Sequence, residues 1–133
     1  MAKRMKASKS LRGLILVALF LLVLAASAVA EPQGGTVTAG SAVIDQATAG
    51  VTNITQFTDR VIINWERYGI NLNELVRYLQ PNELAVALNR VTGVDPSLIL
   101  GSLQANGRIF ILNPNGILFG PQARVDVGGL MAS

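Results

Sequence analysis

The chain has 133 residues, a length that fits one domain, and it carries a formal net charge of +3. It has no cysteine and no histidine, which excludes a disulfide scaffold, thiolate metal sites, His-ligated zinc and histidine-activated nucleophiles. Five of the eleven basic residues lie in the first twelve positions, so the segment from Glu31 onward has six arginines against eight carboxylates, a net charge of −2. That segment has no basic stripe, and we predict no nucleic-acid partner for it.

A secretory signal peptide is predicted over residues 1–30. Its basic part precedes Leu14, an apolar stretch continues to Ala26, and Ala28-Val29-Ala30 fits the small-x-small rule for cleavage. The alternative is an uncleaved membrane anchor, but an anchor needs roughly 20 apolar residues, more than the apolar stretch from Leu14 to Ala26 provides. We therefore expect a signal peptide helix, cleavage after Ala30 and a mature chain that begins at Glu31.

The next segment is rich in Gly, Thr, Ala and Val, which favour extended chain. The first clear strand is predicted at Val61–Trp65, with Trp65 as a buried anchor. Two interpretations remain open for residues 71–91. Their helix formers, with Asn82 as a possible N-cap, favour helix, as does Asp95-Pro96 further on. Against this, Pro81 and Gly93 divide the segment into pieces of about ten residues, each marginal as a helix.

The last third of the chain alternates short apolar runs with turn signals, from "LILGSL" through "RIFIL" and "ILFG" to "ARVDV". This spacing predicts an all-β chain of many short strands. The runs are too apolar for a sheet wetted on one face, and the connections are too short for crossover helices. A parallel β-solenoid satisfies both conditions, because each strand pairs with its equivalent one coil later.

The sequence Asn113-Pro114-Asn115-Gly116 interrupts the apolar runs. Asn, Pro, Asn and Gly in this order are favoured at the four positions of a type I turn, so a corner between two strands is predicted. We expect the Asn115 amide to be free and to face outward. The side chains that flank the corner are expected to be buried: Phe110, Ile111, Ile117 and Phe119.

Four ordered blocks of the sequence resemble the secretion domain of the filamentous-haemagglutinin family, the TpsA exoproteins of two-partner secretion. The blocks are Leu88–Gly93, Pro96–Gly107, Asn113–Gly120 and Val127–Ser133. The resemblance implies a right-handed parallel β-helix with an N-terminal cap, which we assign to residues 31–60. Residues 61–133 are then the start of the β-helical secretion domain, incomplete at its C-terminus. The family's second motif, NPNL, is absent.

The resemblance also implies a route and partners. The family crosses the inner membrane through the Sec machinery, loses its leader to signal peptidase, and crosses the outer membrane of Gram-negative bacteria through a TpsB transporter. The transporter's periplasmic POTRA domains engage the secretion domain, and the matched motif Asn113, Pro114, Asn115 and Gly116 is a candidate recognition element. The product is secreted or held at the cell surface, commonly as an adhesin and virulence factor.

Two functions are carried forward. The first is the N-terminal secretion module of a filamentous-haemagglutinin-like exoprotein. The alternative is a small free-standing secreted or surface β-solenoid that binds host glycans or proteins, and a neighbouring transporter gene would distinguish the two. An enzyme is not expected, because the acidic residues are scattered singly, and no cofactor or metal is expected either.

Overall fold

The computed structural model describes residues 30–133, and all regular elements within them are β-strands. The predicted signal peptide and its helix fall on residues 1–29, outside the described residues. The strands are β1 (Thr36–Ala39), β2 (Ala42–Asp45), β3 (Val51–Gln56), β4 (Arg60–Trp65), β5 (Leu75–Leu79), β6 (Val86–Val91), β7 (Ser97–Ile99), β8 (Ser102–Ala105), β9 (Arg108–Leu112), β10 (Ile117–Phe119), β11 (Arg124–Asp126) and β12 (Gly129–Ala132).

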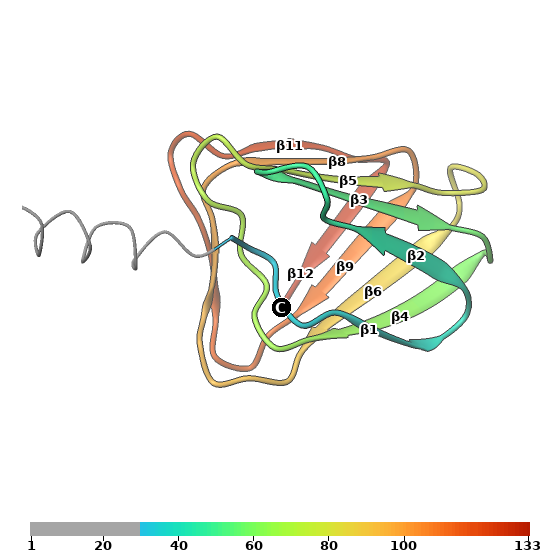
Figure 1. Ribbon diagram of the computed structural model, residues 1–133, viewed down its shortest axis with the longest axis horizontal. Helices are drawn as coiled ribbons and strands as arrows, with labels where there is room; N and C mark the ends of the chain where they lie inside the picture. The colour runs from blue at the N-terminus through green and yellow to red at the C-terminus, as the bar shows by residue number, and fades with distance from the viewer. Residues whose placement is uncertain (1–29) are drawn as a thin grey trace, which may run out of the picture.

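The strands wind into a parallel β-solenoid, which confirms the predicted fold class. One sheet has the order β1-β4-β6-β9-β12 and a second has the order β11-β8-β5-β3-β2 (Figure 1). On the third side, β10 pairs with β7 in a two-stranded sheet. Each of β5, β6 and β7 pairs in parallel with its counterpart in the next coil, which is β8, β9 and β10 respectively. At the start, β1 and β2 run antiparallel to β4 and β3.

The middle of the chain forms strands, so its helical interpretation was wrong. Residues 71–91 contain β5 and β6, and Asp95-Pro96 leads into β7. Asn82 closes a turn between β5 and β6, since its side-chain Oδ1 accepts the Leu84 amide at 3.0 Å. The neighbouring coils on both sides of β5 and β6 supply ladder partners that local helix propensity does not take into account.

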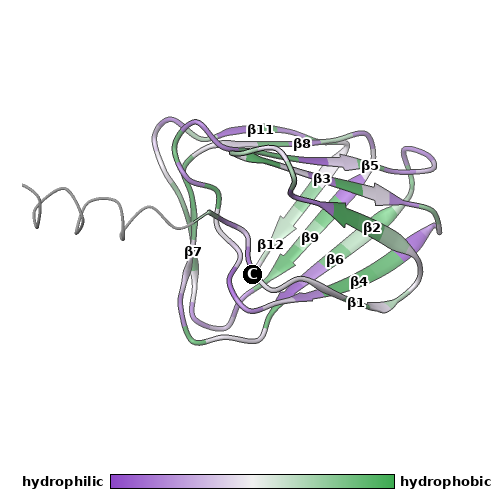
Figure 2. Ribbon diagram, in the orientation of Figure 1, coloured by the Kyte–Doolittle hydropathy of each residue, from purple (hydrophilic) through white to green (hydrophobic). Residues whose placement is uncertain are grey.

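Side chains alternate between the interior and the outer surface even where the sequence does not alternate. In β9, Ile109 and Ile111 are fully buried, whereas Phe110 between them is half-buried on the outer surface. Both faces of this strand are therefore apolar, and β9 and β12 are green, the colour of hydrophobic residues, in Figure 2. The period of two comes from the backbone pleat, so it holds whatever the residue type.

Burial around the predicted corner is only partly as expected. Ile111 is fully buried and Ile117 packs on the core, but Phe110 is only half-buried on the outer surface and Phe119 is 37% exposed. Phe119 pairs in register with Ile99, which is completely buried one coil earlier. Phe119 lies in a later coil that no further strand covers on this side among the described residues, so the same orientation leaves it open to solvent.

A hydrogen-bonded polar cluster sits inside the first coils. Asn89 Oδ1 accepts Trp65 Nε1 at 2.9 Å and the Tyr78 hydroxyl at 2.8 Å, and the Tyr78 and Tyr68 hydroxyls are 2.9 Å apart. Trp65 is fully buried, as predicted. Burial raises the pKa of both Tyr68 and Tyr78, so the cluster stays neutral. Its polar atoms are paired with one another, which is the condition for placing them in an apolar core.

Candidate functional site

The Asn-Pro-Asn-Gly segment forms a tight turn between β9 and β10. The Gly116 amide donates to the Asn113 carbonyl at 3.0 Å, and Gly116 has φ of +104°. A side chain at Gly116 would meet no atom within 4 Å, so glycine is needed there for its backbone conformation and not for space. The Gly116 carbonyl then accepts the Ser97 amide at 2.9 Å, which starts the ladder between β10 and β7.

Asn113 is the buried residue of the corner. Its Oδ1 accepts the Asn115 amide at 2.9 Å, and its Nδ2 donates to the Asp95 carbonyl at 3.0 Å and to Ser97 Oγ at 2.9 Å. Only 2% of Asn113 is exposed. The side chain therefore ties the corner to the coil before it, a role that its local turn preference does not predict. The contacts with Asp95 and Ser97 were not predicted, because the sequence alone does not show which residues of the preceding coil lie beside Asn113.

Asn115 does not have the free amide that the turn pattern predicts. The residue is exposed, but its Nδ2 donates to the Gly93 carbonyl at 2.9 Å and to Asn113 Oδ1 at 3.1 Å. Gly93 is the corner residue of the preceding coil, and a Cβ there would clash with the Glu66 carbonyl. Corners thus stack closely from coil to coil, and this stacking supplies the partner for Asn115. Pro114 remains exposed at the tip.

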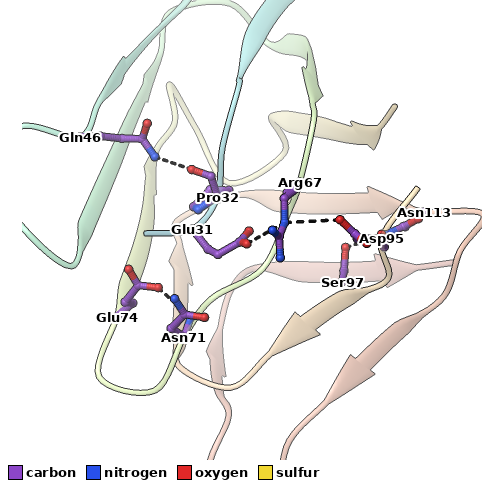
Figure 3. A network of polar contacts seen from close by, with 9 residues as sticks. All are labelled: Glu31, Pro32, Gln46, Arg67, Asn71, Glu74, Asp95, Ser97 and Asn113. Carbon is purple, nitrogen blue, oxygen red and sulfur yellow. Dashed lines mark hydrogen bonds and ion pairs between the residues drawn. The ribbon is translucent and has the colours of Figure 1, made fainter. Parts of the chain in front are cut away.

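A charged network joins the corner to the first described residues (Figure 3). Arg67 Nε lies 3.0 Å from Glu31 Oε1 and 3.8 Å from Asp95 Oδ2, and the Asp95 carbonyl in turn accepts Asn113. Burial raises the pKa of the Glu31 carboxyl above its ordinary value of 4.5, and the adjacent Arg67 guanidinium opposes that shift. The Glu31 side chain is 8% exposed and that of Arg67 is 47% exposed, so solvent screens the pair on one side.

The residues directly after the predicted cleavage site are built into the fold. Glu31 and Pro32 are buried, and the Pro32 carbonyl accepts Gln46 Nε2 at 2.7 Å. Gln33 forms a bridge with Arg67, whose carbonyl accepts the Gln33 amide at 2.9 Å. Among residues 30–133, the first buried residue is therefore Glu31, where the sequence pattern places the start of the mature chain.

Neither a cluster that could bind a metal ion nor a helix that could span a membrane is found among the described residues. Residues 30–133 hold no group of three or more His, Cys, Asp or Glu side chains placed to bind a metal ion. In the same range, no helix is long and apolar enough to cross a membrane. What the arrangement does provide is a stacked surface on which Pro114 and Asn115 are exposed at a corner.

Comparisons with known proteins show the family to which the chain belongs. Residues 28–133 match the TPS secretion domain. Two heme/hemopexin-binding proteins of Haemophilus influenzae, one of them from strain Rd, are 39% identical over 102 residues and 40% identical over 108 residues. These matches cover 77% and 81% of the chain, but only 11% and 12% of the relatives' own lengths.

The same family is represented among solved structures. The HMW1 secretion domain from Haemophilus influenzae matches with a TM-score of 0.71 and 39% sequence identity, over 75% of this chain and 26% of that one. The resemblance inferred from the four sequence blocks is therefore confirmed. The chain belongs to the TPS secretion domain family.

Proposed function

We propose that this chain is the N-terminal secretion module of a longer, adhesin-like exoprotein of the filamentous-haemagglutinin type. The supporting observation is the shared fold and 39% identity with the HMW1 secretion domain. A TPS secretion domain acts in export to the outside of a Gram-negative bacterium and is recognised by a TpsB transporter. In the proposal, residues 1–30 are the leader, residues 31–60 cap the solenoid, and residues 61–133 begin the secretion domain.

The proposed route is Sec-dependent passage into the periplasm, removal of the leader by signal peptidase, and capture by the transporter's POTRA domains. Two features support this order. Glu31 and Pro32 are buried directly after the predicted cleavage site, so a peptidase reaches that bond more readily before the domain folds. The antiparallel strands β1 and β2 pair with the first parallel strands, β4 and β3, and so cover the N-terminal end of the solenoid. Later coils can then fold onto this covered end.

An export assay tests the function. The full chain is produced in a Gram-negative host with and without a co-expressed cognate TpsB transporter. The chain in the medium is quantified, and its N-terminus is read by mass spectrometry. We expect release that depends on the transporter, with an N-terminus at Glu31. Equal release without the transporter would contradict the proposal and favour a free-standing secreted or surface protein that binds glycans or proteins.

The Asn113–Gly116 corner is proposed to serve recognition through its shape and not through a free amide. Asn115→Asp replaces the donor to the Gly93 carbonyl with an oxygen, which destabilises the stacked corners. Export of this variant should fall only in proportion to its loss of stability, which is measured by its melting temperature. Gln122→Glu, at the exposed corner before β11, makes the same change of charge and is the control. Lost export with an unchanged melting temperature would instead mean that the transporter reads Asn115 directly.

A further inference from the structure

One outer face of the solenoid carries an apolar row across four consecutive coils. Ile62 of β4 pairs in register with Leu88 of β6, Leu88 with Phe110 of β9, and Phe110 with Met131 of β12. All four side chains point away from the core, because the residues on either side of Ile62, Leu88 and Phe110 are the buried ones. Met131 is 49% exposed, and the other three are half-buried by one another.

The strands that carry this row are basic. β4, β6, β9 and β12 contain Arg60, Arg90 and Arg108 and no acidic residue, in a mature segment whose net charge is −2. Among the described residues, ion pairs occur only at Arg67. The Nε of Arg90 bonds the neutral Asn64 side chain at 3.1 Å, and that of Arg108 bonds the Leu84 carbonyl at 3.2 Å. The positive charge of the face is therefore not neutralised within the described chain.

The second large sheet differs. Its strands include the acids Asp45 and Asp126 as well as Arg77 and Arg124, so its charge is mixed. One of its outward rows is polar in every coil, because Asn53, Arg77, Gln104 and Asp126 lie in register. An apolar row on strands whose only charged residues are arginines is thus a property of the β4-β6-β9-β12 face and not of the solenoid in general, although the exposed acids Asp59 and Glu66 border β4.

We propose that the β4-β6-β9-β12 face docks an acidic protein surface with an apolar centre, on the periplasmic part of the transporter. The inference rests on the proposed function and adds the place and chemistry of the contact. An apolar core within a rim that includes arginine is the usual composition of a protein interface. A second copy of the chain does not fit, because its face would bring the same unpaired arginines together. An anionic membrane fits less well, because its binding needs an apolar face buried deep among the acyl chains and three of the four side chains in the row are already half-buried.

The test is a calorimetric titration of the purified chain against the purified periplasmic domains of its cognate TpsB transporter. Phe110→Thr with Met131→Thr removes the centre of the row and should weaken the affinity by about tenfold or more, as for a central interface contact. Arg60→Ser with Arg90→Ser should lower the association rate and flatten its dependence on salt. Arg77→Ser with Arg124→Ser, on the other sheet, is the matched control and should bind like the wild type.

The outcomes separate the two proposals. If the wild type binds and the face variants bind equally well while still folded by circular dichroism, the docking face is wrong and the secretion function stands. If the wild type shows no binding and no transporter-dependent export, both proposals fail. Vesicles with anionic lipid are the second probe. Capture of the wild type but not of the face variants, with transporter binding unchanged, would overturn the proposal and assign the face to a membrane.

Discussion

The two ends of the described solenoid expose equivalent residues very differently. Ile109 and Leu130 are in register and point inward, yet Ile109 is completely buried and Leu130 is 40% exposed. Leu103 and Val125 differ in the same way on the other sheet. At the first coil, β1 and β2 pair with β4 and β3, and Val61 is only 1% exposed. Burial at an inward position therefore depends on having a coil on each side.

The largest expected effect is at the closed end. Trp65→Ala removes a fully buried ring that donates to Asn89 and packs edge-on against Tyr68, with ring centroids 5.6 Å apart. We expect a loss of about 3–5 kcal/mol in the free energy of unfolding, because a cavity forms and Asn89 loses a donor. Phe57→Ala, at a ring that is 59% exposed, is the control and should change stability by about 0.5 kcal/mol or less. Urea denaturation measures both, and similar losses would contradict the comparison.

The second prediction compares the ends directly. Ile109→Ala should cost about 2–5 kcal/mol, the range for a large-to-small change in a packed core. Leu130→Ala removes a side chain that is already 40% exposed, so the loss in the free energy of unfolding should be less than half as large. Thermal and urea unfolding of the two variants give the ratio. An equal loss of stability in both variants would mean that Leu130 is buried in solution, which would contradict the proposed difference between the two ends.

The third prediction concerns the Asn113–Gly116 corner, where a buried and an exposed amide lie two residues apart. Asn113→Ala leaves the Asp95 carbonyl and Ser97 Oγ without this donor, and should cost about 1–3 kcal/mol. Asn115→Ala removes a solvent-accessible bond to Gly93 and should cost about 0.5–1.5 kcal/mol. The difference in denaturation midpoint between the variants tests the order, and a reversal would show that the exposed contact dominates the corner.

The smallest expected effect is a dependence of stability on pH. Because the pKa of Glu31 is raised in the folded chain, the folded state holds this proton at pH values where the unfolded state has lost it. The contribution of Glu31 is therefore fully present below about pH 4.5 and is lost as the pH rises through the folded pKa. Glu31→Gln should show a shallower fall in melting temperature between pH 4 and pH 7. Glu83→Gln, on an exposed turn, is the control, and a parallel decline in both variants would refute the role of Glu31.

Resemblance and local pattern predicted different parts of this molecule. Turn chemistry placed the corner at Asn113–Gly116, and the short apolar runs placed β7 to β10 in the last third. Helix propensity misled at residues 71–91, because β5 and β6 take their ladder partners from coils more than twenty residues away. The expected burial of Phe119 failed for a related reason, since a residue's own hydrophobicity does not reveal whether a coil will cover it.

The sequence by itself determined the parallel solenoid and the tight corner, because turn residues and short apolar runs act through local backbone geometry and spacing. It also determined the family, through the resemblance of four ordered blocks. Only the tertiary structure decided the partners of Asn113 and Asn115, the ion pair between Arg67 and Glu31, and the alignment of Ile62, Leu88, Phe110 and Met131 into one row. These contacts depend on the register between successive coils. That register is set by the unequal lengths of the connecting loops and by packing inside the solenoid, and neither can be read from residues that are neighbours in the chain.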